Sequence, residues 1–493
     1  MKAYLVATLL GFLLGLNFID FASSVGSKTY ETNNGFPINF LNDLVNSDVV
    51  QRKISSRWRW EVWDVVPGTH AYQLYVFNIT NPDEVEKGGK PSLQQVGPYY
   101  FKEYRYKFDV SMNLDLSVNF VRNYTYTFDP NDSKGSANDM VNVINVPFVI
   151  FSTLAAKYGS DTTKINQVVS ALVASGESLV KKNVKVQDFL FEGMDVSKYQ
   201  KYLNLMGPST WVTDEFRDGR YGVLKLKNGV HEGSYTVDSG LKSEKGVGKI
   251  LTYNELPSLT YWNGDKCNAI MGSDGSVFPP HLKTSDKLTM FEVDFCRSID
   301  FEYAEEVQYK SVMGSKYHVG KDVLQDPSIN PDNQCFCSKN NSIDACLKEG
   351  VLDVSPCQFG SPFVMSYAHF LDASPEYQQG VVGLKPDPKI HETYVTVELV
   401  TGAVLAFHKR YQWNIWIKPI AGIDYFSKFK STIVPILWND DIFKLDADKE
   451  ELLMEELARQ AGGMGGGAPQ PSQSHAHIHI AMLIITALYL FRN

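Results

Sequence analysis

The residues that most directly imply chemistry are six cysteines, Cys267, Cys296, Cys335, Cys337, Cys346 and Cys357. An even, clustered set of cysteines is typical of disulfide bonds formed in an oxidising compartment. Structural zinc sites instead favour pairs of C-x(2–4)-C motifs, and this chain has a single C-x-C with isolated partners. We therefore expect three disulfides and no metal site, although the spacing leaves fifteen pairings open.

The sequence gives no comparable signal for catalysis. Zinc-protease, nucleophile-elbow and phosphate-loop motifs are absent. Ser178–Lys181 matches S-x-x-K, but the companion motifs of that enzyme class are missing. Three alternating histidines, His475, His477 and His479, are at best weak metal ligands in a flexible stretch. We expect no enzyme and no cofactor.

A second group of candidate functional residues consists of the five lysines between residues 150 and 187, which are Lys157, Lys164, Lys181, Lys182 and Lys185. Only Asp161 and Glu177 oppose them there, whereas the whole chain has a net charge of -9. A local positive charge of this kind attracts anionic ligands. The alternative is a solvated helix face, which composition alone favours. The acidic chain as a whole argues against a nucleic-acid partner.

Hydrophobic segments lie near both ends of the sequence. Ala3–Ile19 follows Met1-Lys2 and precedes small residues at Ala22 and Ser24, as in a secretory signal, but it is also near the lower length limit of a membrane anchor. Ile478–Phe491 would span about 21 Å as a helix, less than the roughly 30 Å hydrocarbon core. Glycines and a polar spacer precede it, which is the pattern of a glycolipid-anchor signal.

These segments divide the chain into expected regions. Residues 1–24 are a signal peptide or N-terminal membrane anchor, and 25–460 form a single ectodomain. Residues 461–477 are a flexible glycine-rich linker, and 478–491 are a hydrophobic tail, either a lipid-anchor signal or a short membrane helix. In a secreted ectodomain, four N-x-[ST] motifs become expected glycosylation sites, at Asn78, Asn123, Asn131 and Asn340.

The periodicity of the ectodomain predicts a mixed, β-rich domain with a helical insertion. Alternation predicts strands through most of 58–128, and the turn at Thr401-Gly402 joins two further strands. Asp218-Gly219 and Asn228-Gly229 predict hairpin turns. Helical spacing predicts helices at 36–56, 148–157, 163–180 and 446–460. The third carries an apolar stripe of Ile165, Val168, Val169, Leu172, Val173 and Leu179.

Several short blocks rich in glycine, proline and aromatic residues, each with a different sequence, are distributed over residues 38–440. They include Tyr75–Val85, Gly89–Pro91, Val96–Phe101, Gly233–Gly240, Gly272–Pro280, Ser366–Phe370, Gly383–Pro386, His391–Tyr394 and Lys409–Gln412. In this order they resemble the class B scavenger receptor family. That family includes fatty acid translocase, the high-density-lipoprotein receptor, the lysosomal integral membrane protein and the insect sensory neuron membrane proteins.

The resemblance implies an α+β fold, a large asymmetric antiparallel β-barrel with a helical apex bundle and an internal hydrophobic tunnel. It places the apex at 146–191 and a disulfide region at 267–357, and it selects the pairing Cys267–Cys335, Cys296–Cys357 and Cys337–Cys346. In the family the apex captures ligands and the tunnel carries lipids toward the membrane. The resemblance thus gives the five lysines a candidate ligand-binding role.

The expected function is a cell-surface scavenger-type receptor that binds and transfers fatty acids, sterol esters, anionic phospholipids or lipoproteins. The alternative is an adhesion or transport receptor whose apex helices engage a protein partner. The expected location is the extracellular face of the plasma membrane. A lysosomal location is disfavoured, because the C-terminal run ends at Arg492-Asn493 without a sorting signal.

Overall fold

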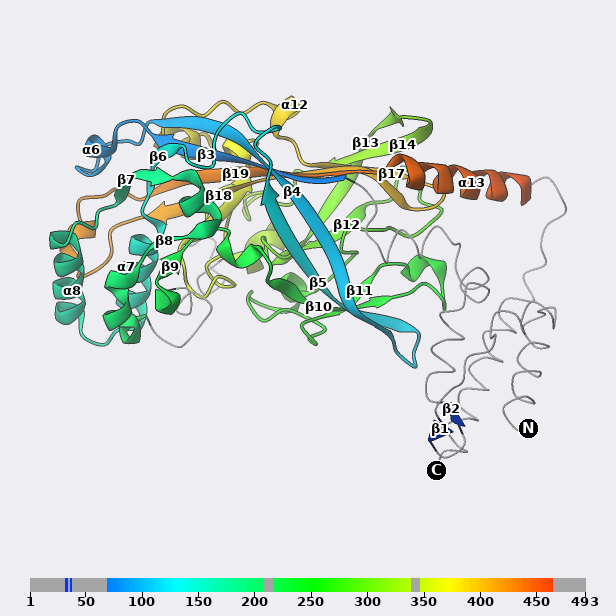
Figure 1. Cartoon of the computed structure of the whole chain (residues 1–493), viewed down its shortest axis with the longest axis horizontal. Coiled ribbons are helices and arrows are strands. Elements are labelled where there is room, and N and C mark those ends of the chain that lie inside the picture. The colour runs from blue at the N-terminus through cyan, green and yellow to red at the C-terminus, as the bar shows by residue number, and fades with distance from the viewer. Residues whose placement is uncertain (1–31, 34–35, 38–68, 207–215, 338–345, 464–493) are drawn as a thin grey trace.

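One large antiparallel sheet dominates the computed structural model, which describes residues 32–33, 36–37, 69–206, 216–337 and 346–463 (Figure 1). Among these residues the sheet has thirteen strands. Eleven follow in the order β11 (Ile250–Tyr253), β10 (His231–Asp238), β5 (Ser117–Phe128), β4 (Leu93–Met112), β3 (Thr69–Ile79), β19 (Thr432–Lys444), β18 (Ala403–Ile417), β17 (Tyr394–Glu398), β14 (Val312–Val319), β13 (Arg297–Tyr309) and β12 (Leu288–Glu292). β15 (Val351–Asp353) pairs with β16 (Phe363–Tyr367), which pairs with β18.

The sheet curls into a nearly closed barrel, and a short segment at Ser273 bridges its two edge strands. Ser273 pairs with Lys249 beside β11 and with Met290 on β12. Gly272 makes this approach feasible, because it adopts a φ of +79° and a Cβ there would lie 1.9 Å from the carbonyl oxygen of Thr289. The Gly272–Pro280 block of the sequence therefore closes the barrel.

The described chain begins and ends its barrel path at one end of the molecule. Thr69, the first residue of β3, pairs with Lys444, the last residue of β19. Helix α13 (Ala447–Gly463) continues from there, while α6 (Pro82–Val85), α7 (Val146–Tyr158) and α8 (Thr162–Ala174) lie at the opposite end (Figure 1). The barrel therefore separates the α7–α8 end from the end at which the chain arrives and leaves.

Helices α7 and α8 share the far end with short strands and turns. β6 (Met140–Ile144) pairs with β7 (Val180–Lys185), and β8 (Met194–Asp195) pairs with β9 (Arg220–Tyr221). A π-helical turn spans Asp188–Glu192 and a 3-10 helix spans Ser197–Leu205. Both α-helices begin with a side-chain cap, as Asn145 accepts a hydrogen bond from the Phe148 amide and Asp161 accepts one from the Lys164 amide.

Three local predictions are wrong, the end of one helix and two hairpins. The helix predicted over 163–180 ends at Ala174, because Gly176 adopts a left-handed φ of +97° and Val180 starts strand β7. Neither predicted glycine turn joins a hairpin: Gly219 leads into β9, whose partner is the distant β8, and Gly229 follows a 3-10 turn. Both glycines have positive φ, so the turn chemistry was correctly predicted but the strand pairing was not.

The remaining elements are short. They are β1 (Thr32–Asn33), β2 (Phe36–Pro37), α10 (Asp265–Asn268), α11 (Pro375–Gly380), α12 (Pro388–His391) and 3-10 turns at Lys225–Lys227, Glu244–Gly246, Pro331–Phe336, Ala368–Phe370 and Asp424–Phe426. The hairpin predicted at Thr401-Gly402 joins β17 to β18. The three disulfides are Cys267–Cys335, Cys296–Cys357 and Cys337–Cys346, the pairing that the resemblance implies.

Several predicted segments lie wholly or largely outside the described residues. These are the N-terminal run, the helix predicted at 36–56, the C-terminal tail and most of the linker. Helix α13 extends to Gly463, three residues beyond the expected boundary at 460. Within the described ranges, no helix has the length and apolar character that crossing a bilayer requires.

Candidate functional site

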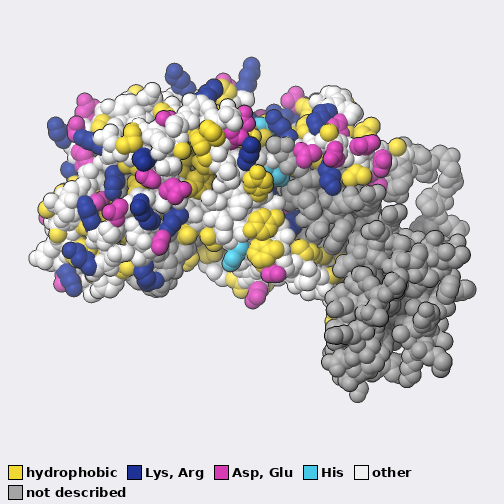
Figure 2. Space-filling model, in the orientation of Figure 1, with side chains coloured by type: hydrophobic (Ala, Val, Ile, Leu, Met, Phe, Trp, Pro, Cys, Tyr) yellow, Lys and Arg dark blue, Asp and Glu magenta, His cyan; other side chains and the backbone are white. Residues whose placement is uncertain are grey.

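The five lysines singled out in the sequence all lie at the far end of the barrel, but on three different elements. Lys157 lies in the last turn of α7, Lys164 lies in the first turn of α8, and Lys181, Lys182 and Lys185 lie on strand β7. The basic segment is therefore only partly helical, contrary to the sequence prediction. Figure 2 shows basic side chains scattered over this end, with acidic ones between them.

Two of these lysines have acidic partners. Lys182 Nζ lies 2.6 Å from Asp83 Oδ1, and Lys181 Nζ lies 4.0 Å from Glu177 Oε2. Lys157 makes a cation–π contact with the Tyr158 ring, with Nζ 5.1 Å from the ring centroid. Lys164 and Lys185 are exposed. The arrangement presents a dispersed positive surface rather than a single charge cluster.

Glu177 organises this end from the inside. Its Oε2 accepts hydrogen bonds from Asn145 Nδ2 at 2.8 Å and from the Tyr199 hydroxyl at 3.0 Å, and Lys198 Nζ lies 3.2 Å from Oε1. Burial alone would raise the Glu177 pKa, but these partners and Lys181 outweigh it and hold the pKa below its ordinary value. The carboxylate thereby joins the α7 cap, strand β7 and the 3-10 helix.

The apolar stripe of α8 belongs to the core. Ile165, Val168, Val169 and Leu172 are buried and Val173 is half-buried, within the same cluster as α7. Leu179 is buried too, although it lies beyond the helix. The stripe therefore makes helix contacts and does not present an exposed lipid-binding face.

The barrel interior has a layered composition that strand β18 displays along its length. Leu405 and Phe407, near the chain-exit end, are buried apolar side chains, and Phe407 contacts the Phe301 ring of β13. Lys409 follows two positions later, and Trp413 and Ile415 restore apolar character toward the α7–α8 end. Since alternate residues of a strand share a face, a charged layer lies between two apolar ones.

The charged layer consists of paired cations and anions. Its ion pairs are Arg105–Glu103 at 2.6 Å, Arg105–Asp441 at 3.2 Å, Lys409–Asp441 at 3.2 Å, Lys409–Glu292 at 3.1 Å, Arg122–Glu232 at 2.5 Å, Arg122–Asp274 at 3.2 Å, Lys107–Asp274 at 3.7 Å, and Lys227–Asp294. The Lys107 side chain is 0% exposed and that of Asp274 is 1% exposed. Tyr124 links two groups of pairs, since both Arg105 and Arg122 pack over its ring.

The pKa values reflect this balance between burial and pairing. Burial would raise the pKa of Asp274, but Lys107 and Arg122 lower it to about 2, and Lys409 and Arg105 likewise lower that of Asp441 to about 2. Glu103 is different, because burial outweighs the attraction of Arg105 and raises its pKa to about 7. Glu103 therefore exchanges its proton near neutral pH, and burial raises the pKa of Glu292 in the same layer as well.

Sequence reasoning missed this layer. The available signal was the alternation in β4, where Glu103, Arg105 and Lys107 occupy every second position. Such a pattern usually marks a solvent-facing side, yet here the intervening Tyr104 and Tyr106 are 57% and 44% exposed. Antiparallel strands usually place apolar side chains inside and polar ones outside. In this part of β4 the charged side chains face the barrel interior and the aromatic rings face solvent.

The glycosylation motifs differ in accessibility. Asn131 is exposed, whereas Asn78 is half-buried and its Oδ1 accepts a hydrogen bond from the Asn142 amide. Asn123 is buried, and its Nδ2, the atom to which a glycan is attached, donates to the Tyr106 hydroxyl at 2.8 Å. Asn340 lies outside the described residues. Asn131 is thus the best exposed of the three described motifs.

The described residues contain no group of three or more His, Cys, Asp or Glu side chains arranged to hold a metal ion. Their distinguishing features are an asymmetric barrel, a basic helical end and three disulfides on one flank. This combination is an α+β fold built on a large antiparallel β-barrel, as the resemblance implies.

Comparison with known proteins identifies the family. The model of the CD36 family matches residues 35–461, and the chain belongs to that family. Sensory neuron membrane protein 2 of Heliothis virescens is 32% identical over 78% of this chain and 76% of its own length. Sensory neuron membrane protein 1 of Aedes aegypti is 29% identical over 77% and 71%, and scavenger receptor class B member 1 of Cricetulus griseus is 27% identical over 76% and 71%.

Proposed function

We propose that this protein is a membrane receptor that gathers anionic lipids or lipoprotein surfaces at its α7–α8 end and admits their apolar parts to the barrel. The observation that carries the proposal is the separation of the two ends. Thr69 and Lys444 pair at one end, while the five lysines lie at the other (Figure 1). A receptor attached through the chain-exit end would hold its basic surface away from the membrane. The relatives named as a scavenger receptor and as membrane proteins support this class.

The long-range field of the lysines supplies the attraction. Lys164 and Lys185 are exposed, and Lys182 remains 46% exposed despite its pair with Asp83. Each basic residue near an anionic lipid surface contributes about 1 kcal/mol, and the contribution falls with ionic strength. Fatty-acid carboxylates, phospholipid phosphates and lipoprotein surfaces share this chemistry. The receptor therefore discriminates first by charge.

The barrel interior supports lipid transfer in stages. The apolar layers on each side of the charged layer suit acyl chains, but an acyl chain crossing that layer would separate buried ion pairs. Breaking such pairs without compensation is costly. A continuous hydrophobic tunnel therefore requires the charged layer to move aside. Binding and transfer become separable steps of the proposed function.

The test compares two variants with equal net charge. In the first, Lys157, Lys164, Lys181, Lys182 and Lys185 are replaced by Gln. In the control, five exposed lysines elsewhere, Lys242, Lys245, Lys249, Lys321 and Lys389, are replaced by Gln. The full chain is displayed on cultured cells, and binding of phosphatidylserine vesicles is measured at low and physiological salt.

The first variant should lose about tenfold or more in vesicle affinity at low salt, and the control should lose little. Equal losses would show that only net charge matters and would remove the assigned role of the α7–α8 end. Unchanged binding by both variants, with a stable protein complex at this end that ignores lipid, would favour the alternative of a protein-binding receptor.

We also propose that the protein is held at the outer face of the plasma membrane. The sequence pattern at 461–491 and the relatives named as membrane proteins support this location. Treating intact cells with a phosphatidylinositol-specific phospholipase C tests the attachment. Release of the glycosylated ectodomain demonstrates a lipid anchor, and retention demonstrates membrane helices. Absence of the protein from the surface before treatment would contradict the location.

A further inference from the structure

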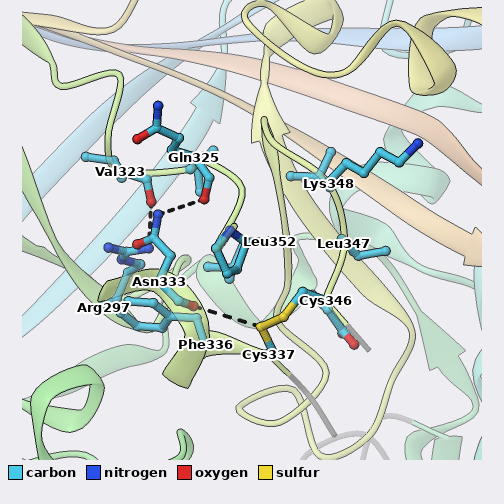
Figure 3. Close-up of a pocket in the computed structure, with 14 residues that line it drawn as sticks. Arg297, Val323, Gln325, Asn333, Phe336, Cys337, Cys346, Leu347, Lys348 and Leu352 are labelled. Carbon is cyan, nitrogen blue, oxygen red and sulfur yellow. Dashed lines mark hydrogen bonds between the residues drawn. A yellow bond between two sulfur atoms is a disulfide. The ribbon is translucent and has the colours of Figure 1, made fainter. Parts of the chain in front are cut away.

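A small pocket lies beside the disulfide Cys337–Cys346, on the flank of the barrel (Figure 3). It is partly open and has a cavity volume of about 40 Å³. One water-sized group needs about 10–15 Å³ by this measure, so the pocket holds about three of them, the size of a carboxylate group. Much of its wall is apolar, from Val323, Leu324, Phe336, Leu347, Val351 and Leu352.

Arg297, the first residue of β13, supplies the charge in this pocket. It is only 9% exposed and its guanidinium carbon lies 3.7 Å from the centroid of the Phe336 ring. Nη1 donates to the Val323 carbonyl oxygen at 2.8 Å and Nε donates to that of Ser298 at 3.3 Å. Among the described residues, no hydrogen bond from Nη2 and no ion pair of this guanidinium is found.

The missing counter-ion distinguishes Arg297 from the other buried arginines. Arg105 pairs with Glu103, Arg122 pairs with Glu232, and Arg410 Nε lies 2.9 Å from Asp440. Burying a charge without a partner is expensive, and one partner left alone destabilises more than a complete pair. A buried guanidinium without an ion pair is therefore a binding group for an anion.

Burial also lowers the Arg297 pKa to about 10, and the more distant Tyr367, Asp300 and Asp322 offset this only in part. Asp353 lines the same pocket, but its Oδ1 accepts a hydrogen bond from the Ser355 amide at 2.9 Å. No carboxylate of the described residues forms an ion pair with Arg297, so a bound anion would supply that ion pair.

The second cation of the lining does not compete for the same ligand. Lys348 extends away from Arg297 in Figure 3, and its Nζ lies 2.5 Å from Glu376 Oε2. The pocket thus offers one unpaired guanidinium, planar and able to bind two oxygens, against apolar walls. A phosphate dianion would need more donors than this, whereas a carboxylate on an apolar chain matches both the charge and the walls.

We propose that this pocket binds a small carboxylate through Arg297, as a free short-chain acid or as the head of a longer one. The site is independent of the lysines at the α7–α8 end and of the charged layer in the barrel. Its two walls are tied together by Cys337–Cys346, since Phe336 and Leu347 each adjoin one of these cysteines.

The experiment measures equilibrium binding of radiolabelled acetate, hexanoate and decanoate to the full chain in lipid nanodiscs, with empty nanodiscs subtracted. Hexanol, inorganic phosphate and chloride serve as competitors. Saturable hexanoate binding that hexanol and phosphate fail to displace is expected. Binding of acetate equal to that of hexanoate assigns a free small acid, whereas binding that strengthens to decanoate assigns the head of a longer acid.

Three variants locate the site. Arg297→Met should weaken hexanoate binding by about tenfold or more, because hydrogen bonds to charged groups are among the strongest. The matched control Lys348→Met removes a neighbouring charge that points elsewhere and should bind like the wild type. Leu347→Trp fills the pocket from a half-buried position, leaves Arg297 in place, and should also abolish binding.

Unchanged hexanoate binding by folded Arg297→Met or by Leu347→Trp would overturn the proposal, as would displacement by chloride or equal affinity for hexanol. The five-lysine variant of the α7–α8 end should retain hexanoate binding, and Leu347→Trp should retain vesicle binding. Loss of hexanoate binding alone would therefore concern the Arg297 pocket, and loss of vesicle binding alone would concern the α7–α8 end.

Discussion

The molecule uses charge in two contrasting regions. At the α7–α8 end, lysines face water and have few close partners, and salt screens the electrostatic field of such exposed charges. In the barrel interior, cations and anions are packed together with side chains as little as 0% exposed. Exposed charges cost the fold little and remain available for ligands, whereas buried charges stabilise the fold only as complete sets. The same residue type thus has opposite roles in the two regions.

The largest expected effect comes from breaking the buried set. Lys409→Met leaves Glu292 and Asp441 without their shared cation, and should cost about 3–5 kcal/mol of unfolding free energy. The control Lys164→Gln removes an exposed charge and should change stability by less than about 0.5 kcal/mol. Urea denaturation followed by tryptophan fluorescence measures both. Similar midpoints for the two variants would mean that the interior pairs are not structural.

Two glycines extend the comparison from charge to backbone. Gly272 and Gly176 both have positive φ, but a Cβ at Gly272 meets the Thr289 carbonyl oxygen at 1.9 Å, whereas nothing lies within 4 Å at Gly176. Gly176→Ala should cost about 1–2 kcal/mol through backbone strain alone. Gly272→Ala should cost clearly more, because it also opens the barrel closure. Thermal unfolding measures the loss of stability in each variant. Equal losses in the two variants would contradict this account.

The contribution of Glu103 to the pH dependence of stability can be tested by substitution. Its folded-state pKa of about 7 exceeds the ordinary value of 4.5, so the folded protein binds the extra proton between these values. The stability from this group is present below pH 4.5 and is lost as the pH rises through 7. Glu103→Gln should therefore reduce the decline in unfolding free energy between pH 5 and 8. An unaltered pH profile in this variant would exclude Glu103 as the titrating group.

Two other carboxylates of the charged layer should have the opposite effect, because their contribution to the unfolding free energy is lost as the pH falls. Asp274 and Asp441 have pKa values lowered from 3.8 to about 2, so their stabilisation is present above about pH 4 and is lost as the pH falls through 2. Asp274→Asn should flatten the loss between pH 4 and 2, at the expense of stability at pH 7. Denaturant midpoints across this range give the measurement, and an equally steep loss in the variant would contradict it.

The smallest expected effect is at the exposed end. Lys182→Gln removes the pair with Asp83, in which the two side chains are 46% and 78% exposed. Such pairs are well solvated, so the melting temperature should not change measurably. Calorimetry at low and high salt provides the check. A salt-sensitive drop would show that this end relies on its ion pairs as the interior does.

Those parts of the fold that depend on neighbouring residues, such as turns and helix starts, could be predicted from the sequence. The even, clustered cysteines indicated disulfides, and Thr401-Gly402 marked a hairpin that joins β17 to β18. Helix α7 starts within two residues of its predicted position, where Asn145 caps it. The family resemblance then supplied the barrel and the disulfide pairing, which periodicity could not.

The parts that escaped prediction depend on contacts between distant residues. The charges of β4 look like those of a solvent-facing side in the sequence, because the carboxylates that pair with Arg105 and Lys107 come from the distant strand β19 and from the Ser273 segment. A lone residue such as Arg297 carries no pattern at all, and only its burial and missing partner single it out. The helix predicted over 163–180 wrongly included the start of strand β7, because the pairing of β7 with β6 cannot be read from local periodicity.

The pairing of Thr69 with Lys444 has a mechanical consequence. Tension that draws these two residues apart would load the β3–β19 ladder from one end, so its hydrogen bonds would break one pair after another, as in a zipper. Tension between Lys444 and the α7–α8 end would instead run along the strands and load many hydrogen bonds together in shear. The barrel should therefore resist a pull between its two opposite ends far better than a pull that separates Thr69 from Lys444.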